Sequence, residues 1–382
     1  MMPRHRICHF SSVHHVWDTR VFYRECVSLA KEFDVTLIAI GEEGSYTRDG
    51  VKVISVSKPK SVFERFLYTV FKVFILAVKQ NAVIYHIHDA EMVPFGIVLS
   101  LLGKSVIYDI HENTHDDILL KTWIKPKIRL FLAKGYNCLL WIGSKFLHYI
   151  VVVADPKFLS KFFVNEKNST IIQNFANPND FETYVVKNRS SLEGNHLFYV
   201  GMIKDMYYDI DPILKSLILL KHKGIHCHLH LVGYVGAGKN LDLEKLDIWE
   251  EIKDQVTFYG FLETKEAYKI SMKCKIGLCI KNQPNSMLVS HERKLFEYMC
   301  VGLPSIYCDA QIYKDLSKHG EIGLAVNLEN SEDISNALIS ILNDDRKLDE
   351  FSGNNLSLAR NYFNWQFEEE KLHQLYNHIL CK

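Results

Sequence analysis

The sequence lacks the paired cysteines that would indicate a disulfide framework or a zinc module. Its nine cysteines are scattered, odd in number, and include no C-x-x-C pair. The opening residues 1–17 also lack the long apolar run and the small-residue cleavage site of a secretion signal. We therefore expect a reducing, cytoplasmic compartment.

Apolar runs long enough to cross a membrane are also missing. Residues 57–80 and 121–148 are rich in apolar side chains, but charges interrupt both short of the roughly 20 residues that a spanning helix needs. The first segment holds five Lys and Arg against one acidic residue, and the second holds six against none. They fit amphipathic helices that cover a sheet, and equally helices that lie on an anionic membrane surface. A peripheral position on the inner face of the plasma membrane therefore stays open.

Neither sign of charge is in excess, since 45 Lys and Arg match 45 Asp and Glu. The charges are unevenly placed, however: residues 1–173 hold 22 basic and 16 acidic residues, or +6, which leaves 23 and 29, or −6, for residues 174–382. This asymmetry indicates two domains with different partners, or domains that attract each other. We expect no nucleic-acid partner.

Strand-like runs alternate with helix-length segments along the 382 residues, which are enough for two domains. Such alternation predicts an α/β fold in which helices cover a parallel sheet. The predicted strands are 6–10, 35–39, 51–56, 82–88, 105–110 and 149–153, then 196–201, 226–233, 256–259, 276–280, 305–307 and 323–326. The predicted helices include 21–33, 62–79, 92–102 and 211–223, and Ser331 is the expected N-cap of another. The sequence thus predicts two Rossmann-like, doubly wound units joined near residues 171–180.

The most informative stretch is "SHERKLFEYMCVGLPSIYCD", residues 290–309. Read as a helix from about Glu292, it places Lys294, Glu297 and Tyr298 on one face. Glu297 can accept hydrogen bonds from both hydroxyls of a ribose and Lys294 can meet a phosphate, which suits a nucleotide-sugar. The spacing fits equally well an exposed Lys–Glu pair on a solvated helix face.

Two other nucleotide-binding motifs are weak or absent. Gly233 to Lys239 has the spacing G-x-x-x-x-G-K, but Asn240 stands where a phosphate-cradling P-loop has Ser or Thr. We interpret this near match as a loop. No predicted strand is followed by G-x-G-x-x-G, which disfavours a dinucleotide oxidoreductase.

Several stretches together are similar to one family. They are "WDTRVFYRECVSLAKEFDVTLIAI", "HIHDAEMVPFG", "VIYDIHEN", "KLFEYMCVGLPSI" and, near the end, "ARNYFNWQFEEEKLHQLY". The chain resembles the retaining GT-B glycosyltransferases of family four that act in bacterial surface-polysaccharide (capsule, O-antigen, exopolysaccharide) biosynthesis. The resemblance implies an acceptor-binding domain at residues 1–173 that faces, across a cleft, a donor-binding domain at residues 174–355. A C-terminal helical segment, residues 356–382, would return to the first domain.

In the second domain the resemblance implies a donor site. Glu297 matches the second of two glutamates eight positions apart and is expected on the donor ribose, with Lys294 on the diphosphate. Gly201, Lys204 and Tyr298 are the other expected donor-binding residues.

The chain also departs from the family pattern. Val289 stands at the position of the first glutamate, and Met202 and Tyr207 stand where the family has a basic pair that neutralises the leaving diphosphate. These departures leave Lys204, Lys294 and Arg20 as the cations that could replace the pair.

In the first domain, His111 aligns with a histidine that the family places near the donor phosphate and the transferred sugar. From the residues alone it could equally be a strand-end histidine. Arg20 is expected to reach the phosphates, and Asp18, His88 and Asp89 are expected on the acceptor side. We count His111, Glu297 and Lys294 as the expected catalytic residues.

Histidine spacing raises the possibility of a metal, since His86 and His88 share one face of a strand and carboxylates follow. The resemblance implies a fold that needs none, so we expect no metal and no other cofactor. The expected function is a retaining hexosyltransferase that uses a nucleotide-diphosphate sugar, UDP-linked in our prediction, and a glycan or polyprenyl-linked acceptor. The alternative is a weak or inactive relative that acts as an assembly subunit.

Overall fold

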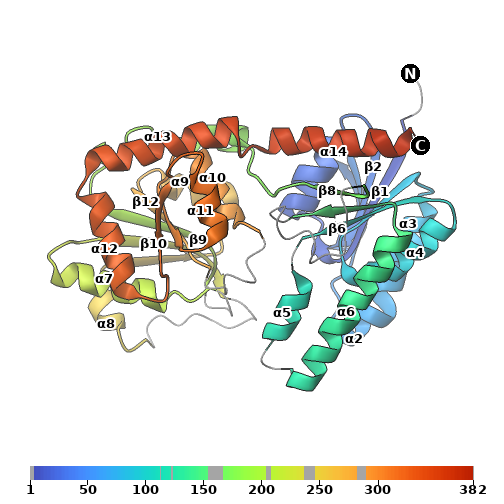
Figure 1. Ribbon diagram of the computed structural model, residues 1–382, viewed down its shortest axis with the longest axis horizontal. Helices are drawn as coiled ribbons and strands as arrows, with labels where there is room; N and C mark the ends of the chain where they lie inside the picture. Colours follow the sequence, from blue (N-terminus) through green and yellow to red (C-terminus); the bar gives the residue numbers. More distant parts are fainter. Residues whose placement is uncertain are drawn as a thin grey trace. The chain divides into compact units, whose positions relative to one another are not determined.

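The computed structural model describes residues 4–111, 113–121, 124–153, 167–203, 208–235, 246–281 and 290–381. They form two compact units, one made of the chain up to Asn174 together with the residues from Gln366 onward, and one made of Phe175–Trp365. Each unit is a largely parallel sheet with helices packed against it (Figure 1). The predicted α/β class with two Rossmann-like units is confirmed.

The first unit has a sheet in the order β3-β4-β2-β1-β5-β6-β7-β8. Only β3 is antiparallel to its neighbour. Its strands are β1 Arg6–His15, β2 Asp34–Ile40, β3 Gly44–Arg48, β4 Val51–Val56, β5 Ile84–Ile87, β6 Ser105–Ile110, β7 Tyr149–Val152 and β8 Ser169–Ile171. The sequence did not predict the two edge strands, because β3 is exposed along its whole length and β8 has three residues, so neither shows an apolar pattern.

The helices of this unit are less regular than the sequence predicted. They are η1 Thr19–Cys26, α1 Val27–Leu29, α2 Val62–Glu64, η2 Arg65–Thr69, α3 Val70–Lys79, η3 Ala90–Met92, α4 Val93–Leu101, α5 Thr114–Leu120, α6 Pro126–Phe146 and α14 Trp365–Leu380. The single helix predicted over 21–33 is wrong: η1 is a π-helix, and the α-helical part ends at Leu29. The wide π turns bury the charged side chains of Arg20, Arg24 and Glu25.

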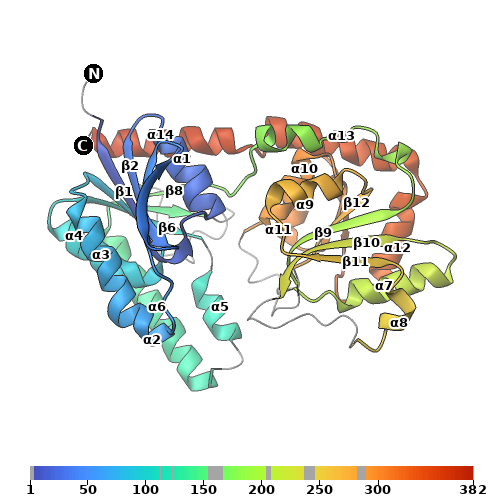
Figure 2. The same ribbon diagram turned by 180° about the vertical axis from the view of Figure 1, so that it is seen from behind.

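The second unit has a fully parallel sheet in the order β11-β10-β9-β12-β13-β14 (Figure 2). Its strands are β9 His196–Ile203, β10 His228–Val235, β11 Val256–Gly260, β12 Ile276–Cys279, β13 Ser305–Cys308 and β14 Gly323–Val326. Its helices are η5 Pro178–Tyr184, η6 Arg189–Ser191, α7 Asp211–His222, α8 Trp249–Ile252, α9 Thr264–Ser271, α10 Arg293–Cys300, α11 Gln311–Ser317, α12 Ser331–Leu342 and α13 Asp345–Asn361. Both faces of the sheet are apolar and covered, as expected of buried parallel strands.

A buried arginine ties the helix ends of this unit together. The Arg189 guanidinium donates to the carbonyls of Gly302 at 2.6 Å, Val301 at 2.7 Å and Ser271 at 3.0 Å, and also to that of Cys274. These carbonyls follow or end α9 and α10, where a helix leaves its last C=O groups without intrahelical partners. Arg189 therefore fixes the position of α10, which carries the predicted donor residues.

Two expected boundaries differ from the structure. The first unit ends at Asn174, one residue after the expected position. The expected boundary at 355/356 falls inside α13, and the units separate ten residues later, between Trp365 and Gln366. The expected N-cap Ser331 is instead the first residue of α12, because the side chain of Asn330 accepts from the N–H groups of Glu332 and Asp333.

Candidate active site

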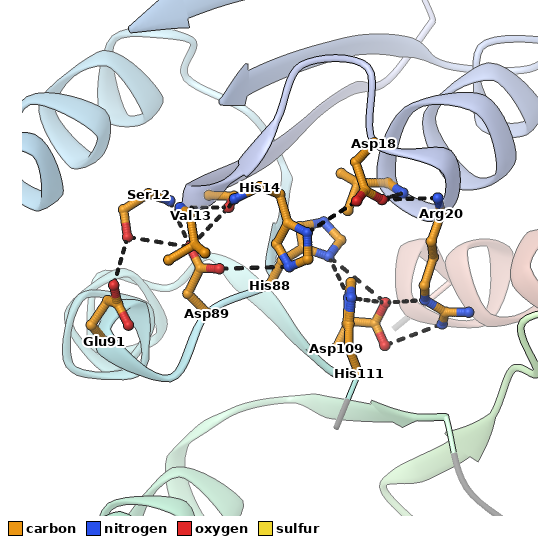
Figure 3. Close-up of polar contacts among 12 residues, drawn as sticks. Ser12, Val13, His14, Asp18, Arg20, His88, Asp89, Glu91, Asp109 and His111 are labelled. Atoms are coloured by element: carbon orange, nitrogen blue, oxygen red, sulfur yellow. Dashed lines mark hydrogen bonds and ion pairs between the residues drawn. The ribbon is translucent and has the colours of Figure 1, made fainter. Parts of the chain in front are cut away.

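In the first unit, polar side chains gather beyond the carboxyl ends of the neighbouring strands β1, β5 and β6 (Figure 3). Ser11 to Asp18 come from the end of β1 and the loop after it, Asp89 from the residues after β5, and Asp109 and His111 from the end of β6. Adjacent parallel strands bring these ends to one edge of the sheet, where doubly wound folds bind ligands. The first-unit part of the candidate site lies here.

The central contact of this group is a buried ion pair. Arg20 Nε lies 2.9 Å from Asp109 Oδ2, and Nη2 donates to Oδ1 at 3.2 Å, while both side chains are almost fully buried. Burial alone would raise the pKa of Asp109, but Arg20 and then His111 hold it well below its ordinary value. Asp109 is therefore a carboxylate. Arg20, which we expected on the donor phosphates, is almost fully buried here and directs Nε and Nη2 to Asp109.

His111 extends this pair toward the surface. Its Nε2 lies 3.0 Å from Asp109 Oδ2 and 3.2 Å from His88 Nδ1. Since a carboxylate only accepts, we assign a proton to Nε2 of His111. The His111 side chain is 15% exposed, whereas those of His88 and Asp109 are fully buried. Of the three, only His111 can contact a ligand directly, and the expected acceptor-side residue His88 acts through it.

Asp89 holds the loop after β1. Its Oδ2 accepts from Ser11 Oγ at 2.9 Å and from the backbone N–H of Ser12 at 2.5 Å. Ser12 Oγ in turn lies 3.0 Å from Glu91. Because Asp89 is buried and oriented by these donors, the structure makes this expected acceptor-side residue a support for the loop.

His14, which we did not predict from the sequence, points into the same group (Figure 3). Its Nδ1 lies 3.3 Å from Asp18 Oδ2 and its Nε2 3.8 Å from Asp89 Oδ1. Burial lowers the pKa of His14, but the hydrogen bond to Asp18 and the charge of Asp89 outweigh it and raise the pKa to about 9. His14 is therefore a partly exposed cation at neutral pH. Its i, i+4 spacing to Asp18, just after the first strand, was the signal that could have found it.

Asp18 serves two purposes in this loop. Oδ1 caps η1 by accepting from the N–H groups of Arg20 at 2.8 Å and Val21 at 2.9 Å, while Oδ2 faces His14. Burial would raise the pKa of Asp18, but the hydrogen bond to His14 and its charge lower it below the ordinary value. This expected acceptor-side residue thus orders the loop that presents His14.

In the second unit, Lys294 on α10 is a buried cation beside the end of β9. Its Nζ lies 3.3 Å from Tyr199 Oη and 4.0 Å from Glu292 Oε2, and sits 4.5 Å and 4.9 Å from the ring centres of Tyr199 and Tyr208. Burial by itself lowers the pKa of Lys294, but Tyr199 and Glu292 raise it above the ordinary value. The ammonium is therefore charged and held over two aromatic faces.

Gly201 makes room for this cation. A Cβ at this position would lie 2.8 Å from Lys294 Nζ, and the residue has a φ of +137°. Only glycine adopts such a backbone without strain. The predicted donor-site residue Gly201 is thus the point where Lys294 reaches the backbone at the end of β9.

Glu297 is buried, and both of its carboxylate oxygens are engaged. Oε1 lies 2.9 Å from Arg293 Nε, and Oε2 accepts from Tyr268 Oη at 2.8 Å. The interpretation of Lys294 and Glu297 as an exposed ion pair is wrong, because both side chains are buried and each has other partners. All residues of α10 from Lys294 to Cys300 are buried, so the helix has no solvated face over that span.

Tyr298 does not have the position that we predicted for a donor-binding residue. Its side chain is fully buried, its Oη accepts from the N–H of Val200 at 3.2 Å, and it donates to the carbonyl of Leu278 at 3.3 Å. Tyr298 therefore joins the neighbouring strands β9 and β12. It supports the site from inside the unit and has no free polar atom for a ligand.

Some expected positions lie outside the described residues. These are Lys204, Tyr207, Val289 and residues 236–240 of the P-loop-like stretch. Met202 is described: it lies near the end of β9, and its carbonyl accepts a hydrogen bond from Tyr199.

The His14–Asp18 pair predicts a pH-dependent stability. Because the folded-state pKa of His14, about 9, lies above the ordinary 6.5, protonated His14 contributes fully below pH 6.5 and loses its contribution as the pH rises to 9. Asp18, with a lowered pKa, loses its contribution only as the pH falls below the ordinary 3.8. His14→Gln should therefore unfold at lower urea than the wild type near about pH 6, and like it near about pH 10. The exposed neighbour His15→Gln is the control; an equal deficit for His14→Gln at both pH values would refute the pair.

The contact between Gly201 and Lys294 predicts a second effect. Gly201→Ala should lower the free energy of unfolding by about 1–3 kcal/mol, because alanine is strained at this φ, and should displace the ammonium. Gly353→Ala in α13, where a Cβ meets no atom within 4 Å, is the matched control and should raise stability by about 0.5–1 kcal/mol. Urea denaturation of the three proteins measures both changes. Equal effects of the two substitutions would show that the close approach at Gly201 is not needed.

Comparisons with known proteins agree with this architecture. Residues 180–356 match the family model described as glycosyl transferases group 1. No curated protein matches the sequence. Among solved structures, a sucrose-phosphate synthase from Thermosynechococcus elongatus has a TM-score of 0.75 at 15% identity, covering 99% of this chain and 100% of its own.

Two further structures have the same fold over nearly the whole chain. HepE from Anabaena in complex with UDP-glucose has a TM-score of 0.71 at 12% identity, covering 98% of this chain and 99% of its own. The lipopolysaccharide outer core galactosyltransferase WaaB has a TM-score of 0.62 at 13% identity, covering 97% and 99%. Identities this low show the fold alone. The family match over residues 180–356 supports the predicted transferase class, and the solved structures show that the chain has the GT-B fold.

Proposed function

We propose that the chain transfers a hexose-type sugar from a UDP-sugar to a lipid-linked or growing surface glycan. The observation that carries the proposal is the buried Lys294 ammonium at the carboxyl end of β9, within the group 1 domain. A glycosyl transfer from such a donor releases a diphosphate. A preorganised cation in a site of low dielectric stabilises that developing charge without having to reorganise.

Lys294 is positioned to bind a diphosphate because it is charged and has no carboxylate in direct hydrogen-bond contact among the contacts described above. Its only carboxylate neighbour among the contacts above, Glu292, is 4.0 Å away and is itself paired with Lys281 at 2.7 Å. Burial raises the pKa of Glu292, but Lys281 and then Lys294 lower it below the ordinary value. Glu292 therefore stays ionised and holds two cations at the same edge of the sheet. In our proposal these cations do the work of the family's missing basic pair.

Glu297 is our candidate for the donor ribose. A carboxylate has about four lone-pair sites, and Arg293 and Tyr268 use two of those on Glu297. The sites that remain can accept from two ribose hydroxyls. Arg293 and Tyr268 fix the orientation of the carboxylate in advance, as a binding site requires.

The first unit contributes two side chains to the proposed reaction, the imidazole of His111 and the cation of His14. His111 is partly exposed and lies next to the charged His14, whose ring centre is 4.7 Å away. We propose that His111 contacts the transferred sugar and that His14 favours a negatively charged group there. In the retaining mechanism implied by the resemblance, the leaving phosphate assists the incoming hydroxyl, so no protein nucleophile is required.

The choice of UDP rests on a structural neighbour. The HepE structures of the same fold were determined with UDP and with UDP-glucose. The second unit of this chain presents Lys294 and Glu297 on one helix, α10, as a nucleoside diphosphate would require. This supports a UDP-sugar as the first donor to test.

Calorimetric titration with UDP and GDP tests the donor site. We expect UDP to bind, and Lys294→Met to weaken it by about 10–100-fold, the range for a charge-assisted hydrogen bond. Glu297→Gln removes the charge of this side chain but keeps its shape. It should weaken the binding of nucleotides that have both ribose hydroxyls more than the binding of their deoxy analogues. Lys269→Met, an exposed lysine of α9, is the control and should bind like wild type. Failure of folded wild-type protein to bind either nucleotide would favour the assembly-subunit alternative.

A membrane surface is the second part of the proposal, and it rests on exposed apolar side chains. The helices α2, α3, α4 and α6 lie together on one side of the first unit, joined by ring contacts between Phe95 on α4 and Phe71 and Phe74 on α3 (Figures 1 and 2). Large side chains on these helices are well exposed, with Phe63 at 74%, Leu101 at 70% and Phe131 at 75%. We take these exposed side chains as one patch, the kind of feature that marks an interaction surface.

Charge identifies an anionic membrane as the partner we favour. Lysines and arginines accompany these aromatic residues in segments 57–80 and 121–148. The second segment holds six of them and no acidic residue. In the described part of the chain, no helix combines the length and apolarity that crossing a bilayer demands. Interfacial helices that carry Phe and Trp beside Lys and Arg bind anionic lipids by apolar burial together with charge attraction. A polyprenyl-linked acceptor would be presented at such a surface.

Vesicle co-sedimentation tests the surface. We expect binding to vesicles that contain phosphatidylglycerol, weaker binding to phosphatidylcholine alone, and release by salt. The double variant Phe63→Ser, Phe131→Ser should bind at least about tenfold more weakly, since each lost apolar side chain contributes more than 1 kcal/mol. Phe261→Ser is the matched control, because Phe261 is 71% exposed but lies in the second unit. Equal losses in both variants, or no vesicle binding by the wild type, would show that the patch serves another partner.

A further inference from the structure

A second group of histidines lies inside the first unit, beneath the candidate site. His9 on β1 and His86 on β5 are register partners in the sheet, and His88 follows on the same face. Glu25 of η1 lies against them. One nitrogen from each histidine and one oxygen of Glu25 all lie within 4.8 Å of one another, and all four side chains are buried.

Several polar atoms of this group have no hydrogen-bond partner. Within the described ranges these are both carboxylate oxygens of Glu25 and Nε2 of His86. Arg20 Nε lies 3.0 Å from Glu25 Oε1, but Arg20 is already hydrogen-bonded to Asp109. Glu25 Oε1 thus has an ion pair with Arg20, and Asp109 also interacts with this carboxyl group. Oε2 of Glu25 and Nε2 of His86 are buried without a hydrogen-bond partner, which is costly and calls for an explanation.

The remaining nitrogens of the three rings, in contrast, are held from outside. Tyr376 Oη on α14 lies 2.9 Å from Nε2 of His9 and 2.7 Å from Nδ1 of His86. Nδ1 of His88 faces His111 at 3.2 Å and Asp109 at 3.7 Å. In metal sites, ligating histidines use one nitrogen for the metal and hydrogen-bond the other to a second residue, which fixes the ring. Tyr376 is such a partner for His9 and His86.

We propose that His9, Glu25, His86 and His88 bind one divalent zinc ion. Three imidazole nitrogens and one carboxylate oxygen form a donor set that suits Zn²⁺. His9 Nδ1 lies 3.0 Å from His88 Nε2 and 3.9 Å from Glu25 Oε2. These separations bracket the roughly 3.3 Å between ligand atoms in a tetrahedron with bonds of about 2.0–2.1 Å. The ion would replace the proton that His9 and His88 share.

The proposed site is structural. All four ligands are protein side chains and are buried, so no coordination position opens to a substrate. It joins η1, β1 and β5, and through Tyr376 also α14, the helix that follows the second unit in sequence. The proposal departs from our sequence-based expectation that the protein has no metal. The zinc proposal does not depend on which sugar donor or glycan acceptor the protein uses.

Metal content tests the proposal without an activity assay. The protein is produced with a cleavable tag free of histidine, dialysed against a chelator and analysed by inductively coupled plasma mass spectrometry. We expect about one zinc per chain. Protein from cobalt-supplemented cells should show the visible absorption bands of four-coordinate Co²⁺, a readout that requires no mutation.

Variants locate the ion. Glu25→Gln and His86→Gln should lose it, and Tyr376→Phe should keep it with affinity lowered by about 10–100-fold. His230→Gln, a buried and hydrogen-bonded histidine of the second unit, is the matched control and should retain one ion. Wild-type protein without metal, both from zinc-supplemented cells and after refolding with Zn²⁺, would overturn the proposal. Retention of the full metal content by a folded His86→Gln would overturn it as well.

Discussion

The candidate site in the first unit depends on the buried ion pair between Arg20 and Asp109. These residues are far apart in sequence, and their pairing fixes the π-helical start of η1 against the end of β6. A buried pair of this kind contributes little net stability over an apolar contact, but loss of one partner is costly because the other charge stays behind. Its value here is geometric: Asp109 also orients His111. One carboxylate thus connects the packing of the first helix to His111, whose side chain is partly exposed.

Each unit keeps one cation of its candidate site charged, but the two units use different neighbouring groups. The second unit keeps Lys294 charged with aromatic rings and with Glu292, which Lys281 also neutralises. The first unit keeps His14 charged with two carboxylates, Asp18 and Asp89, that at the same time order its loop. In both units the cation stands at the carboxyl edge of a parallel sheet. Each is therefore preorganised before any anionic ligand arrives.

The sequence predicted the sheet well because most strands are buried on both faces and so appear as apolar runs. It failed at β3 and β8, which have no such run, and at η1, because a π-helix has wider turns than the α-helix whose period the sequence pattern was matched to. Asp18, Asp89 and His111 gather because each follows or ends a parallel strand, and the carboxyl ends of these strands lie at one edge of the sheet. Which atoms pair cannot be read from position: Arg20 meets Asp109 instead of solvent, and Tyr298 faces the strands instead of the site. Partner choice depends on side-chain direction and depth, which only the folded chain determines.

The charge of His14 could not be predicted from the sequence either, because it arises from two carboxylates that come from different segments of the chain. The proposed zinc ligands His9, His86 and His88 are connected to the same site through Asp109. A zinc ion on Nε2 of His88 would place the proton of that ring on Nδ1, which faces Asp109 at 3.7 Å. Asp109 Oδ2 would then have three N–H groups around it, from Arg20, His88 and His111. Three N–H groups around one carboxylate would keep Asp109 ionised. The interior ion and the exposed nitrogen of His111 would in this way be linked through a single carboxylate.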